Sequence, residues 1–218
     1  MCTIYRSLRP ADFPAVKQLI NESFALHTYI ENESVLKCCL DAYLQSCLAE
    51  ATFSCVAERS GVVIGVIMGK ADSDDRLLPH VKPFLALAYH TLCMSLNALR
   101  AQCDLRDYRH LHRIYEELSA SYPQRFDGVL TLFAVAGDCR GLGVGKQLLG
   151  RLLAYQKEHG VTSIYLYTDT TCNVGFYDRH GFVPLARQTM RVRRNHAYEE
   201  ITVFLYGYRP AIGRDGGQ

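Results

Sequence analysis

Apolar and polar positions follow two different periods along this chain, and the changes between them predict the order of helices and strands. Apolar residues three or four positions apart indicate amphipathic helices, whereas short β-branched or aromatic runs between turn residues indicate strands. We expect strands at residues 3–8, 53–58, 62–70, 130–135, 163–167, 182–185, 188–193 and 200–206. We expect helices at residues 12–24, 34–48, 81–105 and 105–120, then one helix that Gly160 ends and a short one that Gly181 ends. The chain is therefore predicted to be α/β and to open with a strand, two helices and a β-hairpin.

The stretch from Leu130 to Leu153 is predicted to form a strand, a glycine-rich loop and an amphipathic helix, in that order. Glycines let the backbone approach a ligand closely, and the first N–H groups of a helix have no partner within the helix. The helix dipole adds a favourable field for an anion, worth roughly 0.3–1 kcal/mol per charge near the helix end. A phosphate or pyrophosphate is therefore the expected guest, and a glycine-rich turn without a ligand is the alternative.

The spacing of the glycines decides between phosphate ligands. The loop does not fit the P-loop pattern G-x-x-x-x-G-K-[ST], and Gly141 to Gly145 is one residue short of the dinucleotide pattern G-x-G-x-x-G. Arg140, Gly143 and Gly145 instead match R-x-x-G-x-G, and residues 176–182 read F-Y-x-x-x-G-F. Together these two motifs resemble those of the GCN5-related N-acetyltransferases, the GNAT superfamily, in which the first motif is the acetyl-CoA loop.

This resemblance implies the GNAT fold, an α/β (α+β) architecture with a mixed, mostly antiparallel central sheet flanked by helices. It covers about two-thirds of the chain and predicts a single domain, residues 1–208, followed by a tail, residues 209–218, that we expect to be mobile. Residues 71–127 exceed the minimal family plan and form a predicted helical insertion between the third and fourth strands. The insertion either forms a wall of the acceptor site, forms the contact of a homodimer, or adds a packing layer that has no role in the reaction.

Composition narrows the class of protein further. The chain has 218 residues and a formal net charge of +2, so its overall charge indicates neither a nucleic-acid partner nor an anionic membrane. The apolar run in 81–105 is interrupted by His90, Asn97 and Arg100, which argues against a membrane span. The nine cysteines form no C-x-x-C pair and no zinc spacing, and the first residues lack the apolar core of a signal peptide. We therefore expect a cytoplasmic protein with reduced thiols and no metal.

The resemblance also implies the residues that bind acetyl-CoA. The predicted cofactor-binding residues come from the end of the fourth strand, the loop and the short helix: Phe133, Ala134, Val135, Arg140, Gly141, Leu142, Gly143, Val144, Gly145, Lys146, Asn173 and Tyr177. The N–H of Val135 is the predicted oxyanion donor, and Tyr177 matches the family's general acid near the thioester sulfur. The alternatives are that Tyr177 only packs and that Asn173 only caps the short helix.

The acceptor side is less defined by the sequence. Tyr29, Glu31 and Glu33 lie in the link between the first two helices, which borders the acceptor pocket in the resembled family, and Asp169 is a fourth candidate. Many relatives carry a glutamate on the fourth strand where this chain has Thr131. The general base therefore stays open between Glu31, Glu33, Asp169, two further residues (Asp127 and His112) and an ordered water held by strand carbonyls.

The predicted function follows from these residues. We expect acetyl transfer from acetyl-CoA to a primary amine of a small molecule by direct attack in a ternary complex, since a thioester is already activated. The competing class is a non-catalytic acyl-CoA-binding sensor or partner-binding protein.

Overall fold

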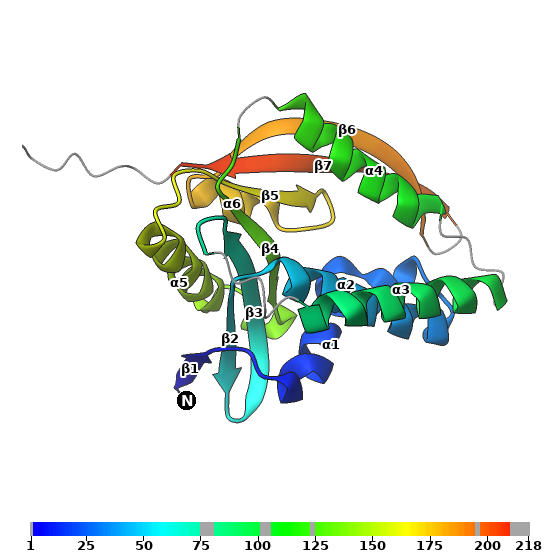
Figure 1. Ribbon diagram of the computed structural model, residues 1–218, viewed down its shortest axis with the longest axis horizontal. Helices are drawn as coiled ribbons and strands as arrows, with labels where there is room; N and C mark the ends of the chain where they lie inside the picture. Colours follow the sequence, from blue (N-terminus) through cyan, green and yellow to red (C-terminus); the bar gives the residue numbers. More distant parts are fainter. Residues whose placement is uncertain (1, 75–80, 101–105, 123–124, 195–196, 210–218) are drawn as a thin grey trace, which may run out of the picture.

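A computed structural model describes residues 2–74, 81–100, 106–122, 125–194 and 197–209 (Figure 1). The strands are β1 Thr3–Arg6, β2 Phe53–Arg59, β3 Val62–Ala71, β4 Gly128–Val135, β5 Ile164–Asp169, β6 Val183–Arg194 and β7 Ala197–Tyr208. The α-helices are α1 Phe13–Phe24, α2 Glu33–Glu50, α3 Val81–Arg100, α4 Arg106–Ser121, α5 Val144–Glu158 and α6 Val174–Arg179. Short 3-10 turns lie at Pro10–Asp12, Leu26–Thr28 and Gly137–Cys139. The predicted tail from residue 210 onward lies outside the described residues.

The described strands form one sheet in the order β1-β2-β3-β4-β5-β7-β6. Every neighbouring pair is antiparallel except β4 and β5, which run parallel on either side of the α5 crossover. The predicted mixed, mostly antiparallel α/β fold is therefore confirmed. Helix α5 packs on one face of the β2–β4 half and α1 and α2 pack on the other, while α4 covers β6 and β7 (Figure 1).

The sheet splits in its middle. Over their described lengths, β4 and β5 pair only at Gly128–Ile164 and Val129–Tyr165. Beyond these two pairs β4 continues along β3, whereas β5 continues along β7. The V-shaped opening between the two strands is the feature that positions the site.

Two local predictions are wrong. The strands expected at 182–185 and 188–193 are one strand, β6, because a bulge between Pro184 and Ala186 shifts the register against β7 and interrupts the alternation that marks a strand. The sequence also favours Asp12 as the N-cap of the first helix, but its side chain makes no capping hydrogen bond to α1. Its carboxylate instead accepts two hydrogen bonds from the Arg6 guanidinium, at 2.7 and 2.8 Å.

This ion pair carries a prediction about stability. Hydrogen bonds from Arg6 hold the pKa of the Asp12 carboxyl below its usual value, against the opposing effect of burial. A carboxyl whose pKa is lowered by folding stabilises the protein above its unfolded pKa, about 3.9, and loses that contribution as the pH falls further. We expect Asp12→Asn to lower the free energy of unfolding by about 2 kcal/mol at pH 7 and by much less at pH 3.

Urea unfolding at both pH values measures the effect. Glu158→Gln, on the exposed end of α5, is the control and should change stability little at either pH. A deficit of Asp12→Asn that is the same at pH 3 and pH 7 would contradict the role given to the charge.

Helices α3 and α4 lie between β3 and β4, in the segment predicted to be an insertion. The two helices pack against different parts of the fold: α3 packs along α2, whereas α4 packs on β6 and β7 (Figure 1). Helix α3 ends at Arg100 rather than 105, and residues 101–105 fall outside the described ranges. One side of α3 exposes four large apolar side chains, at spacings of three, four and three: Tyr89, Leu92, Leu96 and Leu99. None of the helices, over the part of the chain that the structure describes, is long and apolar enough to cross a membrane.

Candidate active site

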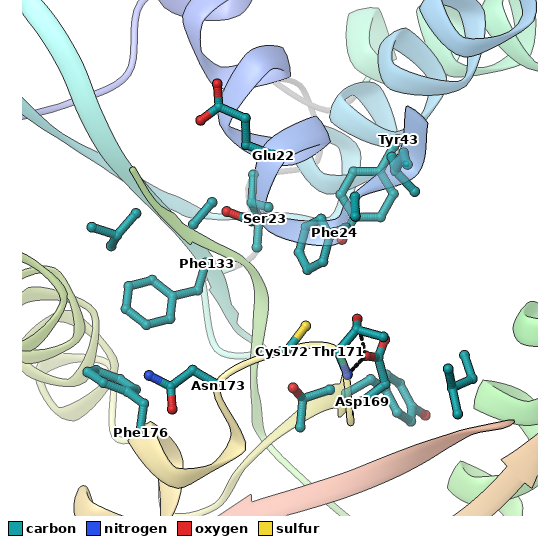
Figure 2. Close-up of a pocket in the computed structure, with 18 of the residues that line it drawn as sticks. Glu22, Ser23, Phe24, Tyr43, Phe133, Asp169, Thr171, Cys172, Asn173 and Phe176 are labelled. Atoms are coloured by element: carbon teal, nitrogen blue, oxygen red, sulfur yellow. Dashed lines mark hydrogen bonds between the residues drawn. The ribbon is translucent and has the colours of Figure 1, made fainter. Parts of the chain in front are cut away.

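A cavity of about 1540 Å³ opens at the split between β4 and β5 (Figure 2). The end of α1 and the middle of α2 form one side, and the β5–α6 segment forms the other. Figure 2 shows Phe24 and Tyr43 on the first side, Asn173 and Phe176 on the second, and Phe133 of β4 between them. The cavity thus joins the glycine-rich loop to the link between α1 and α2, as an enzyme with two substrates requires.

The loop forms one end of the cavity. Gly143 adopts φ +79° directly before α5, a conformation that glycine reaches without steric cost. Helix α5 then begins at Val144, so the N–H groups of its first turn are turned toward the loop without intrahelical partners. Arg140 and Lys146 also line the cavity, and they place two positive charges beside those N–H groups. This end is suited to an anion such as a pyrophosphate.

The open edge of β4 lies next to the loop. The N–H of Ala136 donates to the carbonyl of Ile64 at 2.9 Å, which marks Ala136 as a hydrogen-bonded position of the β3–β4 ladder. Antiparallel ladders alternate, so the N–H groups of Val135 and Phe133 point away from β3, toward the side where β5 has diverged. These groups are available to a ligand that enters the split.

Tyr177 lies across the split from Phe133, with its ring centroid 6.4 Å away. Its side chain is 8% exposed and still lines the cavity. Burial raises the pKa of the phenol above its ordinary value, with a smaller contribution from nearby Cys172. The phenol therefore stays protonated across the neutral range and can donate a proton or a hydrogen bond.

Cys172 reaches the same cavity, and Figure 2 shows its sulfur pointing into it. Burial raises the pKa of this thiol to about 11, so the reactive thiolate is scarce near neutral pH. This environment does not favour Cys172 as a nucleophile.

The other end of the cavity is aromatic and acidic. The tyrosines that line it come from the α1–α2 link, α2, α4, β5 and β7: Tyr29, Tyr43, Tyr115, Tyr165, Tyr167 and Tyr198. Asp169, at the end of β5, accepts hydrogen bonds from both the backbone and the hydroxyl of Thr171. Glu31 lines the cavity at its exposed rim.

Several predicted residues lie elsewhere. Glu33 is exposed in the first turn of α2 and does not line the cavity. Asp127 accepts four hydrogen bonds from Thr162 and Ser163, which lower the pKa of its carboxyl and tie the start of β4 to β5. Leu142 points into solvent and Val144 is buried in the core, so these two face a ligand through their backbone alone. The side chain of His112 is outside the described residues.

Sequence reasoning missed one polar feature of β4. The register against β3 shifts between Met68 and Gly69, which leaves Thr131 as the extra residue of a bulge. Its hydroxyl is buried and makes no hydrogen bond to any described residue, although Thr131 lines the cavity. A buried hydroxyl without a partner marks a place for a water or a polar group of a ligand.

Comparisons with known proteins identify a family for this chain. Residues 13–182 match the model of the Acetyltransferase (GNAT) family. No curated protein matches the chain.

Solved structures share the fold at low sequence identity. A histone acetyltransferase HPA2 and related acetyltransferase from Corynebacterium glutamicum is 20% identical, with a TM-score of 0.56 over 98% of this chain and 99% of that one. The ribosomal-protein-S18-alanine N-acetyltransferase from Escherichia coli is 13% identical, with a TM-score of 0.54 over all of both chains. The PaiA N-acetyltransferase from Thermoplasma acidophilum, solved in complex with coenzyme A, is 15% identical, with a TM-score of 0.51 over 96% of this chain and all of that one.

Proposed function

Because the chain belongs to the GNAT family of acetyltransferases, we propose that it moves an acetyl group from acetyl-CoA to a primary amine of a small molecule. The observation that carries this proposal is one cavity that joins an anion-binding loop, an open strand edge and a buried phenol. The loop suits the pyrophosphate of an acyl donor, the open strand edge suits the donor's extended arm, and the phenol suits the leaving thiolate.

The residues of the loop fit the donor. Gly141 and Gly143 both adopt positive φ angles and have no side chain that would cover the backbone. A Cβ added at either residue would meet no atom within 4 Å, so there is room for a phosphate group. Arg140 and Lys146 supply charge at the same end. Acetyl-CoA supplies an activated thioester, and this chain holds it beside the amine, an arrangement worth several kcal/mol of the barrier.

The proposed chemistry needs no covalent enzyme intermediate. The amine nitrogen forms a bond to the thioester carbonyl carbon, the carbon–sulfur bond breaks, and the thiolate takes a proton. The N–H of Val135 is the proposed donor to the carbonyl oxygen as it gains negative charge. Tyr177 is the proposed proton donor to the thiolate.

The amine must lose a proton before or during attack. Asp169 and Glu31 are the predicted carboxylates that line the cavity. The unpartnered hydroxyl of Thr131 favours an ordered water near the strand as the first acceptor of that proton. Asp169 or Glu31 then receives it from the water.

Thiol release measured with acetyl-CoA against a panel of amines tests the proposal. We expect turnover with at least one small primary amine and saturation in both substrates. If CoA binds but no amine of any size is acetylated, the chain is an acyl-CoA-binding sensor instead. Loss of CoA binding altogether would remove both functions.

We also propose that the predicted homodimer contact uses the exposed side of α3. Tyr89, Leu92, Leu96 and Leu99 repeat as two adjacent a and d pairs of a heptad, the spacing with which two helices pack along each other. Cys93 and Ser95, which flank the centre of this row, carry no formal charge, so like charges do not face each other there. A second copy of α3 is therefore the proposed occupant.

Light scattering on a size-exclusion column measures this contact. We expect the double variant Leu92→Glu/Leu99→Glu to weaken association about 100-fold or more, because it buries like charges between the copies. Val62→Glu, an equally exposed apolar position at the start of β3, is the control and should leave the mass unchanged. A wild-type chain that is monomeric at every concentration would refute the contact.

A further inference from the structure

The acceptor end of the cavity has two aromatic walls. On the β5 side, the ring of Tyr167 stacks on Tyr115 at 4.4 Å and meets Tyr165 edge-on at 5.7 Å. On the helical side, Phe24 and Tyr43 meet edge-on at 5.7 Å. All five rings line the same cavity.

Tyr43 connects these walls to the reacting end. Burial raises the pKa of its phenol well above the ordinary value, and the groups whose charge would raise it further include Tyr115, Cys172 and Tyr177. Tyr43 is therefore within electrostatic range of both the α4 wall and the proposed proton donor. Tyr177 lines the same cavity as the two aromatic walls, so an acceptor seated between them shares one space with the proposed proton donor.

Contacts of Arg194 connect two elements that line this cavity. Arg194, at the end of β6, donates a hydrogen bond of 2.8 Å to the Thr28 hydroxyl and lies over the Tyr29 ring, 5.5 Å from its centroid. Glu199 of β7 holds the same guanidinium at 3.5 Å. The β6–β7 hairpin is thereby tied to the α1–α2 link, and these contacts form one boundary of the chamber.

Asp169 is one of the carboxylates that line this cavity. Asp169 is half-buried, and Thr171 holds one of its oxygens, while Oδ2 makes no hydrogen bond to any described residue (Figure 2). Tyr29 lines the same cavity, and the pKa of its phenol is raised by burial and further by the charge of Asp169. An amine that arrives as an ammonium ion is attracted by this carboxylate and by the faces of the rings.

From these observations, we infer that the acceptor is a small aromatic amine, with an aryl ring between the tyrosine walls and a primary amine on a short aliphatic arm. This inference rests on the proposed acetyl transfer and specifies its substrate class. The α4 helix supplies Tyr115, so the segment between β3 and β4 determines acceptor specificity rather than only adding a layer.

Acetylation of three probes by the full chain tests the inference: 2-phenylethylamine, n-butylamine and a lysine-containing peptide. We expect kcat/KM to be at least about tenfold higher for 2-phenylethylamine than for n-butylamine, the ratio that corresponds to a difference of 1.4 kcal/mol. The peptide should not be acetylated.

Variants locate the effect in the chamber. Tyr115→Leu should raise KM for 2-phenylethylamine about tenfold and leave KM for acetyl-CoA unchanged, and Tyr165→Leu provides a second test should the first variant not fold. Tyr122→Leu removes a ring that also stacks on a neighbour, Phe126 at 5.4 Å, but lies outside the cavity, so it should behave as wild type.

The failures of the two proposals are distinguishable. Equal kcat/KM for the aryl and alkyl amines, preference for the peptide, or a KM that neither Tyr115→Leu nor Tyr165→Leu changes would overturn the aromatic acceptor while acetyl transfer stands. Absence of thiol release with all three probes and a wider amine panel, despite binding of CoA, would overturn the transfer reaction itself.

Discussion

Replacing Gly143 by glutamate is expected to weaken CoA binding by at least 100-fold. The residue directly precedes α5 at φ +79°, and the open space around it would receive a carboxylate. A negative charge there would repel the pyrophosphate and compete with it for the N–H groups of the first helical turn. The positive φ adds a backbone strain of roughly 1–2 kcal/mol for a residue with a Cβ.

Two controls separate charge from strain and from fold. Gly143→Asn tolerates the left-handed conformation without adding charge, so it should bind CoA much more tightly than the glutamate variant. Gly150→Glu adds the same charge to the exposed middle of α5, where a Cβ also meets nothing within 4 Å, and should bind as wild type does. Titration calorimetry with CoA gives each dissociation constant, and near-native affinity of Gly143→Glu would show that the pyrophosphate lies elsewhere.

Replacing Tyr177 by phenylalanine is expected to lower kcat about 100-fold and to change KM for acetyl-CoA little. A general acid contributes roughly 100- to 10,000-fold to a rate, and the lower figure applies where water can partly replace the donor. The ring itself stays in place against Phe133 and Phe182, so packing is preserved. Steady-state kinetics with a saturating amine measure the change.

A matched variant distinguishes an acid from a packing residue, and the pH profile checks that the acid stays protonated. Burial raises the pKa of the Tyr177 phenol, so the phenol remains protonated as the pH rises. Deprotonation of Tyr177 should therefore cause no decrease in the kcat of the wild type at any pH up to about 10. Tyr206→Phe is the matched control, because that hydroxyl donates to Asp178 at 3.0 Å and does not line the cavity. Equal kcat for Tyr177→Phe and wild type would leave Tyr177 with a structural role alone.

The donor side was predictable because its signals are local. The strand, the glycines and the helix of Leu130 to Leu153 are consecutive, and each has a short-range physical signature in turn chemistry or periodicity. The parallel neighbours β4 and β5 also followed from one strand–helix–strand unit. Local chemistry could not reveal the bulge at Thr131, since an extra residue in a ladder is defined by its partner strand.

The acceptor side was not predictable for a different reason. Tyr43, Tyr115 and Tyr167 come from three elements that are distant in sequence, and each fits the apolar face of its own helix or strand. Their convergence depends on tertiary packing of α4 against β6 and β7, which no local pattern encodes. Arg194 is a similar case, since its partner Thr28 is separated from it by 166 positions.

The two residue pairs between β4 and β5 also have a thermodynamic consequence. Among the described residues, only the pairs Gly128–Ile164 and Val129–Tyr165 join one half of the sheet to the other by ladder hydrogen bonds, so relative motion of the halves meets little resistance from the backbone there. On the proposed function, the donor enters this gap and bonds to the free edge of β4. It then contributes stability by mass action, about 2.7 kcal/mol at a concentration of 100 times its dissociation constant. The integrity of the sheet is thereby coupled to the supply of acetyl donor.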